Sequence, residues 1–283
     1  IFRKYDVRYF FYNGGNDSMD TCNKISKYMQ SVGYACRVIG VPKTIDNDLN
    51  GTDHCPGFGS AARYIATTCM EVQRDTHVYD NGTITVLEIM GRHAVWLTAA
   101  SRLARKFEGD NPFLIYLPEA PFELEAFYHD LEEAFQKSPN VVVCVSEGIA
   151  DASRTFICEY ANEAQLDTFG HKMLTGCGKV LENYVRREFG VKVRSIELNV
   201  SQRCSGMVVS AADIDEAVQA GSFGVASALA GETGKMVGFE RRGTNVYKNH
   251  CILVDVNEVC NKEKTFPTQW ITGGGCDISP DFL

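Results

Sequence analysis

Short apolar segments alternate with helix-like segments along most of this chain. Runs rich in β-branched and aromatic residues indicate strands, and apolar residues recurring every three or four positions indicate helices. The expected strands are 7–12, 35–39, 83–89, 113–117, 141–145, 191–198, 236–239 and 251–256. The expected helices are 19–31, 60–74, 93–107, 122–136, 178–189 and 214–230. Because helices commonly connect parallel strands, this order predicts an α/β fold with mostly parallel sheets covered on both faces.

The most polar junction in the chain follows the second of these strands. Residues 43–48 read Lys-Thr-Ile-Asp-Asn-Asp, directly after an apolar run that ends in proline. Open α/β sheets bind ligands beyond the carboxyl ends of their strands. There Lys43 could neutralise phosphate charge, Thr44 could donate its hydroxyl, and Asp46 or Asp48 could accept a proton or hold a metal. The alternative interpretation is an Asx-rich turn with no ligand.

A glycine pair joins the first strand to the first helix. Gly14 and Gly15 break the strand, and Asp17 and Ser18 are residues that can cap the helix that follows. The amino end of a helix presents free N–H groups and a positive dipole end, so this turn is a candidate anion site. Many α/β proteins contain similar turns, and the pattern alone does not select a ligand.

Two more strand ends carry candidate ligand-binding residues. Met90, Gly91 and Arg92 follow the strand at 83–89, and Glu147 follows the strand at 141–145. Arg92 could bind phosphate through two hydrogen bonds, and the alternative is a solvated arginine at a helix start. Glu147 could accept hydrogen bonds from sugar hydroxyls, and the alternative is a surface acid before a turn.

The chain after residue 148 is less regular. Ser210 and Asp213 form a capping-box pattern before the helix at 214–230. Residues 149–175 are mixed and polar, and their pattern assigns them to neither a helix nor a strand. Apolar residues recur at helical spacing within the helix: Ile214, Ala217, Val218, Gly221, Val225 and Leu229.

Composition narrows the class of function. The net charge is −8, which argues against a nucleic-acid partner because such proteins usually carry a basic patch. The eleven cysteines include no Cys-x-x-Cys pair, and their odd number in an enzyme-like chain suggests a reducing compartment. No apolar run approaches the length of a membrane span, so we expect no membrane partner.

Four motifs in order resemble the phosphofructokinase family. Residues 40–48, Gly-Val-Pro-Lys-Thr-Ile-Asp-Asn-Asp, resemble its signature loop. Three other blocks agree: Gly-Gly-Asn-Asp-Ser at 14–18, Glu-Ile-Met-Gly-Arg at 88–92, and Gln-Arg at 202–203. The resemblance covers about residues 5 to 240. It implies two similar α/β domains with the active site in the cleft between them, here expected at 1–120 and 121–240, with carboxyl-terminal strands and tail at 241–283.

The resemblance also implies roles for individual residues. Asp46 matches the family's proton acceptor, Asp48 its supporting acid, and Lys43 a residue that stabilises charge on the leaving group. Positions matching contacts to fructose 6-phosphate are Thr44, Ile45, Met90, Gly91, Arg92, Glu147 and Arg203. The donor-binding positions are Gly15, Asn16 and Asp17. Magnesium is the implied cofactor, with Asp17 and Asn16 as the expected metal-binding residues.

Two residues distinguish pyrophosphate from ATP as the donor. Lys43 resembles the pyrophosphate-dependent branch, where ATP-using members usually carry glycine. Asp17 also replaces a glycine of ATP-using members, and its carboxylate would repel a nucleotide phosphate. The resemblance therefore implies reversible phosphoryl transfer from pyrophosphate to the 1-hydroxyl of fructose 6-phosphate, a step of glycolysis. The alternatives are an ATP-dependent 6-phosphofructokinase and a catalytically incompetent fragment or regulatory subunit.

The sequence departs from the family pattern in several places. Asn16 stands where a magnesium-binding aspartate is usual, Thr83 stands where a basic residue is usual, and the 6-phosphate ligands are not recognisable in 204–215. The family's amino-terminal glycine-rich segment has no match. We therefore expect the strand at 7–12 to lack the partners that the family normally supplies from upstream, and the isolated chain to be poorly active and prone to aggregate. Family membership further implies a cytoplasmic homodimer or homotetramer.

Overall fold

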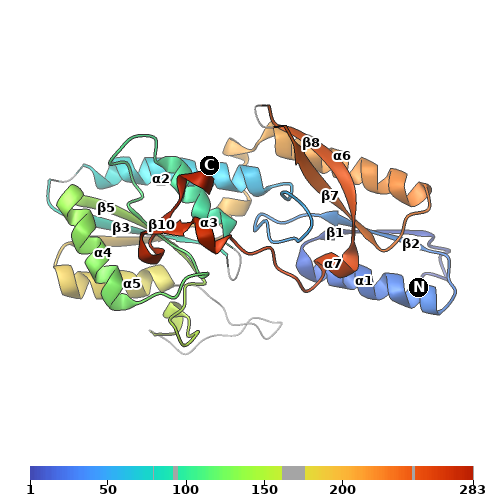
Figure 1. Cartoon of the computed structure of the whole chain (residues 1–283), viewed down its shortest axis with the longest axis horizontal. Helices are drawn as coiled ribbons and strands as arrows, with labels where there is room; N and C mark the ends of the chain where they lie inside the picture. The colour runs from blue at the N-terminus through green and yellow to red at the C-terminus, as the bar shows by residue number, and fades with distance from the viewer. Residues whose placement is uncertain (79, 92–94, 161–175, 244–245, 283) are drawn as a thin grey trace. The chain divides into compact units, whose positions relative to one another are not determined.

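The computed structural model describes residues 1–78, 80–91, 95–160, 176–243 and 246–282, and these form two units (Figure 1). The first unit contains Ile1–Ser60 and Val209–Lys264, and the second contains Ala61–Val208 and Thr265–Leu283. These units differ from the three consecutive segments that we predicted from the sequence. The reason is that the strands after residue 234 return to the sheet built by the amino-terminal strands.

The first unit is built on a four-stranded sheet of order β1-β2-β7-β8. Its strands are β1 (Tyr9–Gly14), β2 (Arg37–Pro42), β7 (Lys235–Arg242) and β8 (Lys248–Asp255). The first three run parallel, and β8 pairs antiparallel with β7. Helices α1 (Asn16–Ser31) and α7 (Val256–Val259) pack with Val38 on one face, while α6 (Ala211–Leu229) packs with Ile39 on the other.

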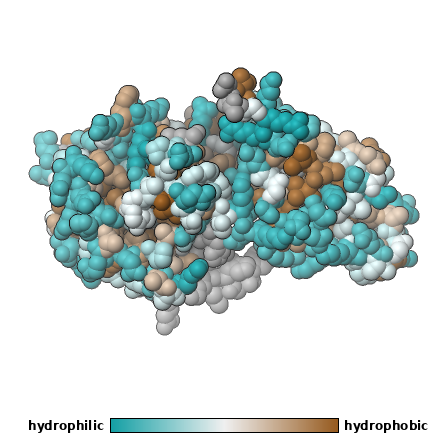
Figure 2. Space-filling model, in the orientation of Figure 1, coloured by the Kyte–Doolittle hydropathy of each residue, from teal (hydrophilic) through white to brown (hydrophobic). Residues whose placement is uncertain are grey.

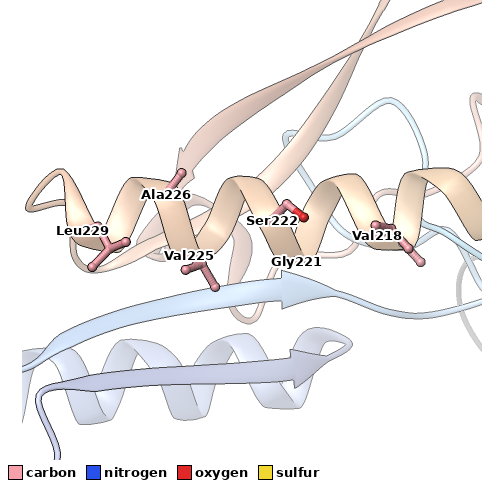
Figure 3. A pocket seen from close by; sticks show the side chains of 7 residues that line it. Val218, Gly221, Ser222, Val225, Ala226 and Leu229 are labelled. Carbon is pink, nitrogen blue, oxygen red and sulfur yellow. The ribbon is translucent and has the colours of Figure 1, made fainter.

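Helix α6 meets the sheet through its small residues. Ala220, Gly224 and Ala228 face the strands, and a Cβ on Gly224 would lie 3.4 Å from a methyl group of Val237. The apolar residues that revealed the helix in the sequence lie on its other side, where Val218 and Leu229 are 65% and 68% exposed. Figure 3 shows Val218, Val225 and Leu229 projecting from one side of α6 into a hollow. The periodicity thus predicted the helix but not the face that it buries.

The capping box predicted at the start of α6 does not form. Ser210 precedes the helix but makes no capping hydrogen bond through its side chain. The carboxylate of Asp213 instead accepts hydrogen bonds from the backbone N–H groups of Gly57 and Ser60, at 2.8 and 2.6 Å. Asp213 therefore holds the segment that leads into α2 (Phe58–Thr76).

The second unit contains a fully parallel sheet of order β4-β5-β3-β6. Its strands are β3 (Thr83–Ile89), β4 (Leu114–Tyr116), β5 (Asn140–Ser146) and β6 (Lys192–Glu197). Its other helices are α3 (Trp96–Ala100), α4 (Leu124–Lys137) and α5 (Cys177–Phe189). A small antiparallel pair joins β9 (Ile271–Thr272) to β10 (Asp277–Ile278). Both four-stranded sheets confirm the predicted α/β class with mostly parallel strands.

Short 3-10 turns complete the described elements. The helix expected at 93–107 is shorter in the structure, because a 3-10 turn follows α3. The first two residues of that expectation, 93 and 94, lie outside the described residues. The turns are η1 (Ser101–Ala104), η2 (Ile157–Tyr160), η3 (Asn199–Arg203), η4 (Gly206–Val208), η5 (Thr268–Trp270), η6 (Gly273–Gly275) and η7 (Pro280–Phe282).

Strand β5 shows how sequence determines burial in the second unit. Val141, Val143 and Val145 join the cluster formed by α4 and α5, while the Cys144 sulfur lies 3.6 Å from the Cys69 sulfur of α2. The strand is buried on both faces, as an unbroken apolar run predicts. Each such side chain contributes roughly 1.5–3 kcal/mol through burial.

The exposed surface is mixed in character. Figure 2 shows hydrophilic residues over most of the visible face, with an apolar patch over β7 and β8. None of the helices in the described ranges has the length and apolar character needed to cross a membrane. All eleven cysteines are free thiols.

Candidate active site

The glycine turn and the polar loop lie next to each other in the first unit. Strands β1 and β2 are parallel neighbours, so their carboxyl ends meet at one edge of the sheet. The Lys43 N–H donates a 3.0 Å hydrogen bond to the Gly14 carbonyl. A Cβ on Gly15 would lie 3.6 Å from the Lys43 carbonyl oxygen and 3.7 Å from the Thr44 side chain. The structure therefore brings together the predicted donor-binding and catalytic segments.

The glycine turn also positions helix α1. A side chain at Gly14 would lie only 2.0 Å from the Ser18 hydroxyl, so the tight entry into the helix requires glycine there. Helix α1 begins at Asn16, and Asp17 lies in its first turn with an exposed side chain. The amino end of a sixteen-residue helix beside Lys43 provides positive potential for an anion.

Asn16 has structural partners on both sides of its amide. Its Nδ2 donates to the Lys262 carbonyl at 2.8 Å, and its Oδ1 accepts from the Asn261 N–H at 2.9 Å. These bonds tie the start of α1 to the segment that follows α7. The predicted donor and metal contacts of Asn16 remain predictions, and they would require this amide to share or exchange its present partners. Asp17 has the more available side chain.

Thr44 holds Asp46 in place. The Thr44 hydroxyl oxygen accepts from the Asp46 N–H at 3.1 Å, and the hydroxyl lies 3.4 Å from a carboxylate oxygen of Asp46. Thr44 is buried, whereas Ile45 and Asp46 are half-buried and Lys43 is exposed. This arrangement places a carboxylate and an ammonium at the carboxyl end of β2, where each remains accessible to a ligand.

Asp48 carries a carboxylate with a raised pKa. Burial is the main cause, and together with the negative charges of Asp46, Glu263 and Asp17 it raises the pKa of Asp48 to about 6. One of its oxygens is buried without a hydrogen-bond partner among the described residues. Since unpaired buried oxygens are costly, a cation or a proton at Asp48 is favourable.

The raised pKa of Asp48 predicts a specific dependence of stability on pH. Its usual value is 3.8 and its folded value is about 6, so the protonated form is favoured by folding. The free energy of unfolding should therefore fall as pH rises from 4 to 6, by roughly 2–3 kcal/mol. Urea unfolding of the parent and of Asp48→Asn across this range would measure the difference. Identical pH profiles for the two proteins would contradict the assignment.

In the second unit, Met90 and Gly91 are held by buried polar side chains. Gln202 accepts from the Met90 N–H at 3.3 Å and donates to the Met90 carbonyl at 3.5 Å. The Glu147 carboxylate accepts from the Gly91 N–H at 3.2 Å, and the Ser146 hydroxyl donates to the Gly91 carbonyl at 2.6 Å. The backbone at Gly91 has φ +150°, which favours glycine.

Three predicted sugar phosphate residues thus meet in the second unit: Met90, Gly91 and Glu147. Arg203 is exposed at the end of η3, one residue after the buried Gln202. Arg92 lies outside the described residues. The sequence did not predict that Gln202 and Ser146 hold the backbone of Met90 and Gly91. The one sequence feature that pointed to Gln202 was its position beside Arg203 in the fourth motif.

These observations define an α/β protein with basic and carboxylate side chains at the carboxyl ends of parallel strands. Residues 1–228 match the family model described as "Phosphofructokinase". The chain belongs to the phosphofructokinase family, which confirms the resemblance found in its motifs.

The chain is also similar to individual relatives. It is 38% identical over 281 residues to the pyrophosphate--fructose 6-phosphate 1-phosphotransferase of Halomonas elongata, covering 99% of this chain and 66% of that protein. It is 39% identical to the enzyme of that name from Rhodospirillum rubrum, covering 100% and 70%. The crystal structure of a pyrophosphate-dependent phosphofructokinase from Marinobacter aquaeolei matches with a TM-score of 0.86 and 36% identity, covering 99% and 67%. The chain therefore spans about two thirds of the length of these relatives.

Proposed function

We propose that this chain catalyses phosphoryl transfer from pyrophosphate to the 1-hydroxyl of fructose 6-phosphate, giving fructose 1,6-bisphosphate reversibly. The observation that carries the proposal is the arrangement at the carboxyl ends of β1 and β2. There Asp46, held by Thr44, lies in the same loop as Lys43, and that loop contacts the Gly14–Gly15 turn. The names of the relatives agree with this choice of donor and acceptor.

Each residue of this loop has a role in the proposed reaction. Asp46 accepts the proton of the attacking 1-hydroxyl, which makes that oxygen a better nucleophile. Lys43 and the amino end of α1 neutralise the charge of the transferred and leaving phosphates. Phosphoryl transfer depends mainly on such positioning and charge neutralisation. Asp48, with its raised pKa, supports Asp46 by limiting the negative charge beside it.

The second unit is proposed to supply the residues that hold the sugar phosphate. Glu147 would accept hydrogen bonds from sugar hydroxyls. Met90 and Gly91 would contact the sugar through a backbone that Gln202 holds at Met90 and Glu147 holds at Gly91. Arg203 would neutralise the 6-phosphate. These roles come from the positions that match the family motifs.

Magnesium fits the acidic character of the first unit. The described residues contain no group of three His, Cys, Asp or Glu side chains that could hold a metal. Magnesium is commonly bound by one or two carboxylates together with water and substrate phosphates. The unpartnered oxygen of Asp48 and the exposed carboxylate of Asp17 suit that mode. When bound, the ion would neutralise phosphate charge.

We further propose that the protein is a cytoplasmic homodimer or homotetramer.

The proposed function predicts a specific product and a specific metal dependence. Purified protein given pyrophosphate, fructose 6-phosphate and Mg²⁺ should form orthophosphate and fructose 1,6-bisphosphate in equal amounts, which ³¹P NMR can follow. Removal of the ion with a chelator should stop the reaction, and excess Mg²⁺ should restore it. Hydrolysis of pyrophosphate without a sugar bisphosphate would contradict the proposal.

A further inference from the structure

Asn47 lies between the two carboxylates of the polar loop and has an unusual backbone conformation. Its φ is +57°, in the left-handed region that few residues other than glycine adopt readily. Its side chain is 3% exposed, and its Oδ1 accepts a 3.0 Å hydrogen bond from the backbone N–H of Cys55. Asparagine tolerates this conformation better than most residues, and here its side chain also pairs a buried N–H group.

The groups around Asn47 are themselves fixed. Cys55 is fully buried in the core of the first unit, and the following segment is held at Gly57 by Asp213. On the other side, the Asp48 carbonyl accepts a 2.8 Å hydrogen bond from the Lys264 N–H. Asn47 is therefore the point at which the chain between Asp46 and Asp48 is connected to a rigid part of the unit.

We propose that Asn47 is a positioning residue that sets the directions of the Asp46 and Asp48 carboxylates for phosphoryl transfer. This inference rests on the function proposed above. The left-handed backbone at Asn47 sets the orientation of the two aspartates relative to each other, and the bond to the Cys55 N–H restrains that backbone. Asn47 is buried, so it acts on the reaction through Asp46 and Asp48.

Two replacements separate the contributions of backbone and side chain. Asn47→Gly permits the positive φ but removes the partner of the Cys55 N–H. Asn47→Ala removes that partner and also disfavours the positive φ. Asn199→Gly is the matched control, because Asn199 has φ +44° and an exposed side chain in the other unit.

The expected result is a loss of turnover with little loss of substrate binding. Misplacing a catalytic group by about 1 Å can cost about a hundredfold. We expect kcat to fall about tenfold in Asn47→Gly and about a hundredfold in Asn47→Ala. The KM values for pyrophosphate and fructose 6-phosphate should change less than about threefold, because no substrate contact is removed. Asn199→Gly should keep the parent values.

Melting temperatures and crystal structures of the variants complete the test. Assays are run well below each melting temperature, so that a difference in kcat reports on folded protein. A parent-like kcat in both folded Asn47 variants would overturn the inference. If the parent itself shows no transfer, the proposed function fails, and the crystal structures decide the positioning role. Displaced Asp46 and Asp48 carboxylates in Asn47→Ala would support the role, and unchanged carboxylates would refute it.

Discussion

Replacing Asp46 with alanine is expected to lower turnover at least about a hundredfold, the usual contribution of a well-placed general base. The carboxylate lies at the carboxyl end of β2, is half-buried, and is held through Thr44. The 1-hydroxyl has a pKa far above neutrality, so its attack on phosphorus benefits from proton removal in the transition state. The effect should appear in kcat, because we propose that the ground-state contacts to the sugar phosphate come from other residues.

Steady-state kinetics of Asp46→Ala and Asp46→Asn would measure this effect. Asp46→Asn keeps the size of the side chain and its hydrogen-bonding oxygen but cannot accept the proton, so it should be nearly as inactive as Asp46→Ala. Asp215→Ala, which removes an exposed carboxylate from helix α6 of the same unit, should behave like the parent. Near-normal turnover in Asp46→Asn would remove Asp46 from the proposed mechanism.

The second large effect concerns the donor. In the proposed reaction Lys43 gives pyrophosphate a cationic partner, whereas the Asp17 carboxylate adds negative charge near the amino end of α1. Two like charges about 4 Å apart repel by about 1 kcal/mol in water and about 4 kcal/mol at an effective dielectric of 20. Since about 1.4 kcal/mol is a tenfold change in affinity, the Asp17 carboxylate alone could disfavour ATP by tenfold or more once the site is closed to water.

The two donor residues should respond in opposite ways to replacement by glycine. Asp17→Gly should admit ATP weakly, because a repulsive charge is removed. Lys43→Gly should lower the efficiency with pyrophosphate at least tenfold, because the leaving group loses its cationic partner. Measuring kcat/KM for both donors in each variant tests the two effects separately. An Asp17→Gly variant with no gain in ATP use would show that another feature excludes the nucleotide.

The strands were predictable because their residues determine both burial and position. Thr83–Ile89 was predicted at the observed bounds, and the buried run around Val143 was predicted within one residue at each end. The polar loop could be placed at the end of β2 for the same reason. Its neighbour, the Gly14–Gly15 turn, was also identified, since the carboxyl ends of parallel strands lie at one edge of a sheet.

The remaining features depend on contacts between residues distant in sequence. Asn16 bonds to residues near position 261, and Asp213 bonds to Gly57 and Ser60 instead of its own helix. Local patterns contain no information about such partners. For α6, the periodic apolar residues suggested a buried face, but the small residues Ala220 and Gly224 fit closer to the sheet. The two units of the structure also differ from the consecutive segments expected from the sequence. The reason is that β7 pairs with β2 across almost 200 residues.

The central claim, that this phosphofructokinase-family chain uses pyrophosphate, is tested most directly by one comparison. The measurement is kcat/KM for pyrophosphate and for ATP, at saturating fructose 6-phosphate and excess Mg²⁺, in the unmodified protein. The ratio does not depend on the fraction of active molecules. We predict that the efficiency with pyrophosphate exceeds that with ATP by at least about a hundredfold, from the combined effects of Lys43 and Asp17. Equal efficiencies, or a preference for ATP, would contradict the account.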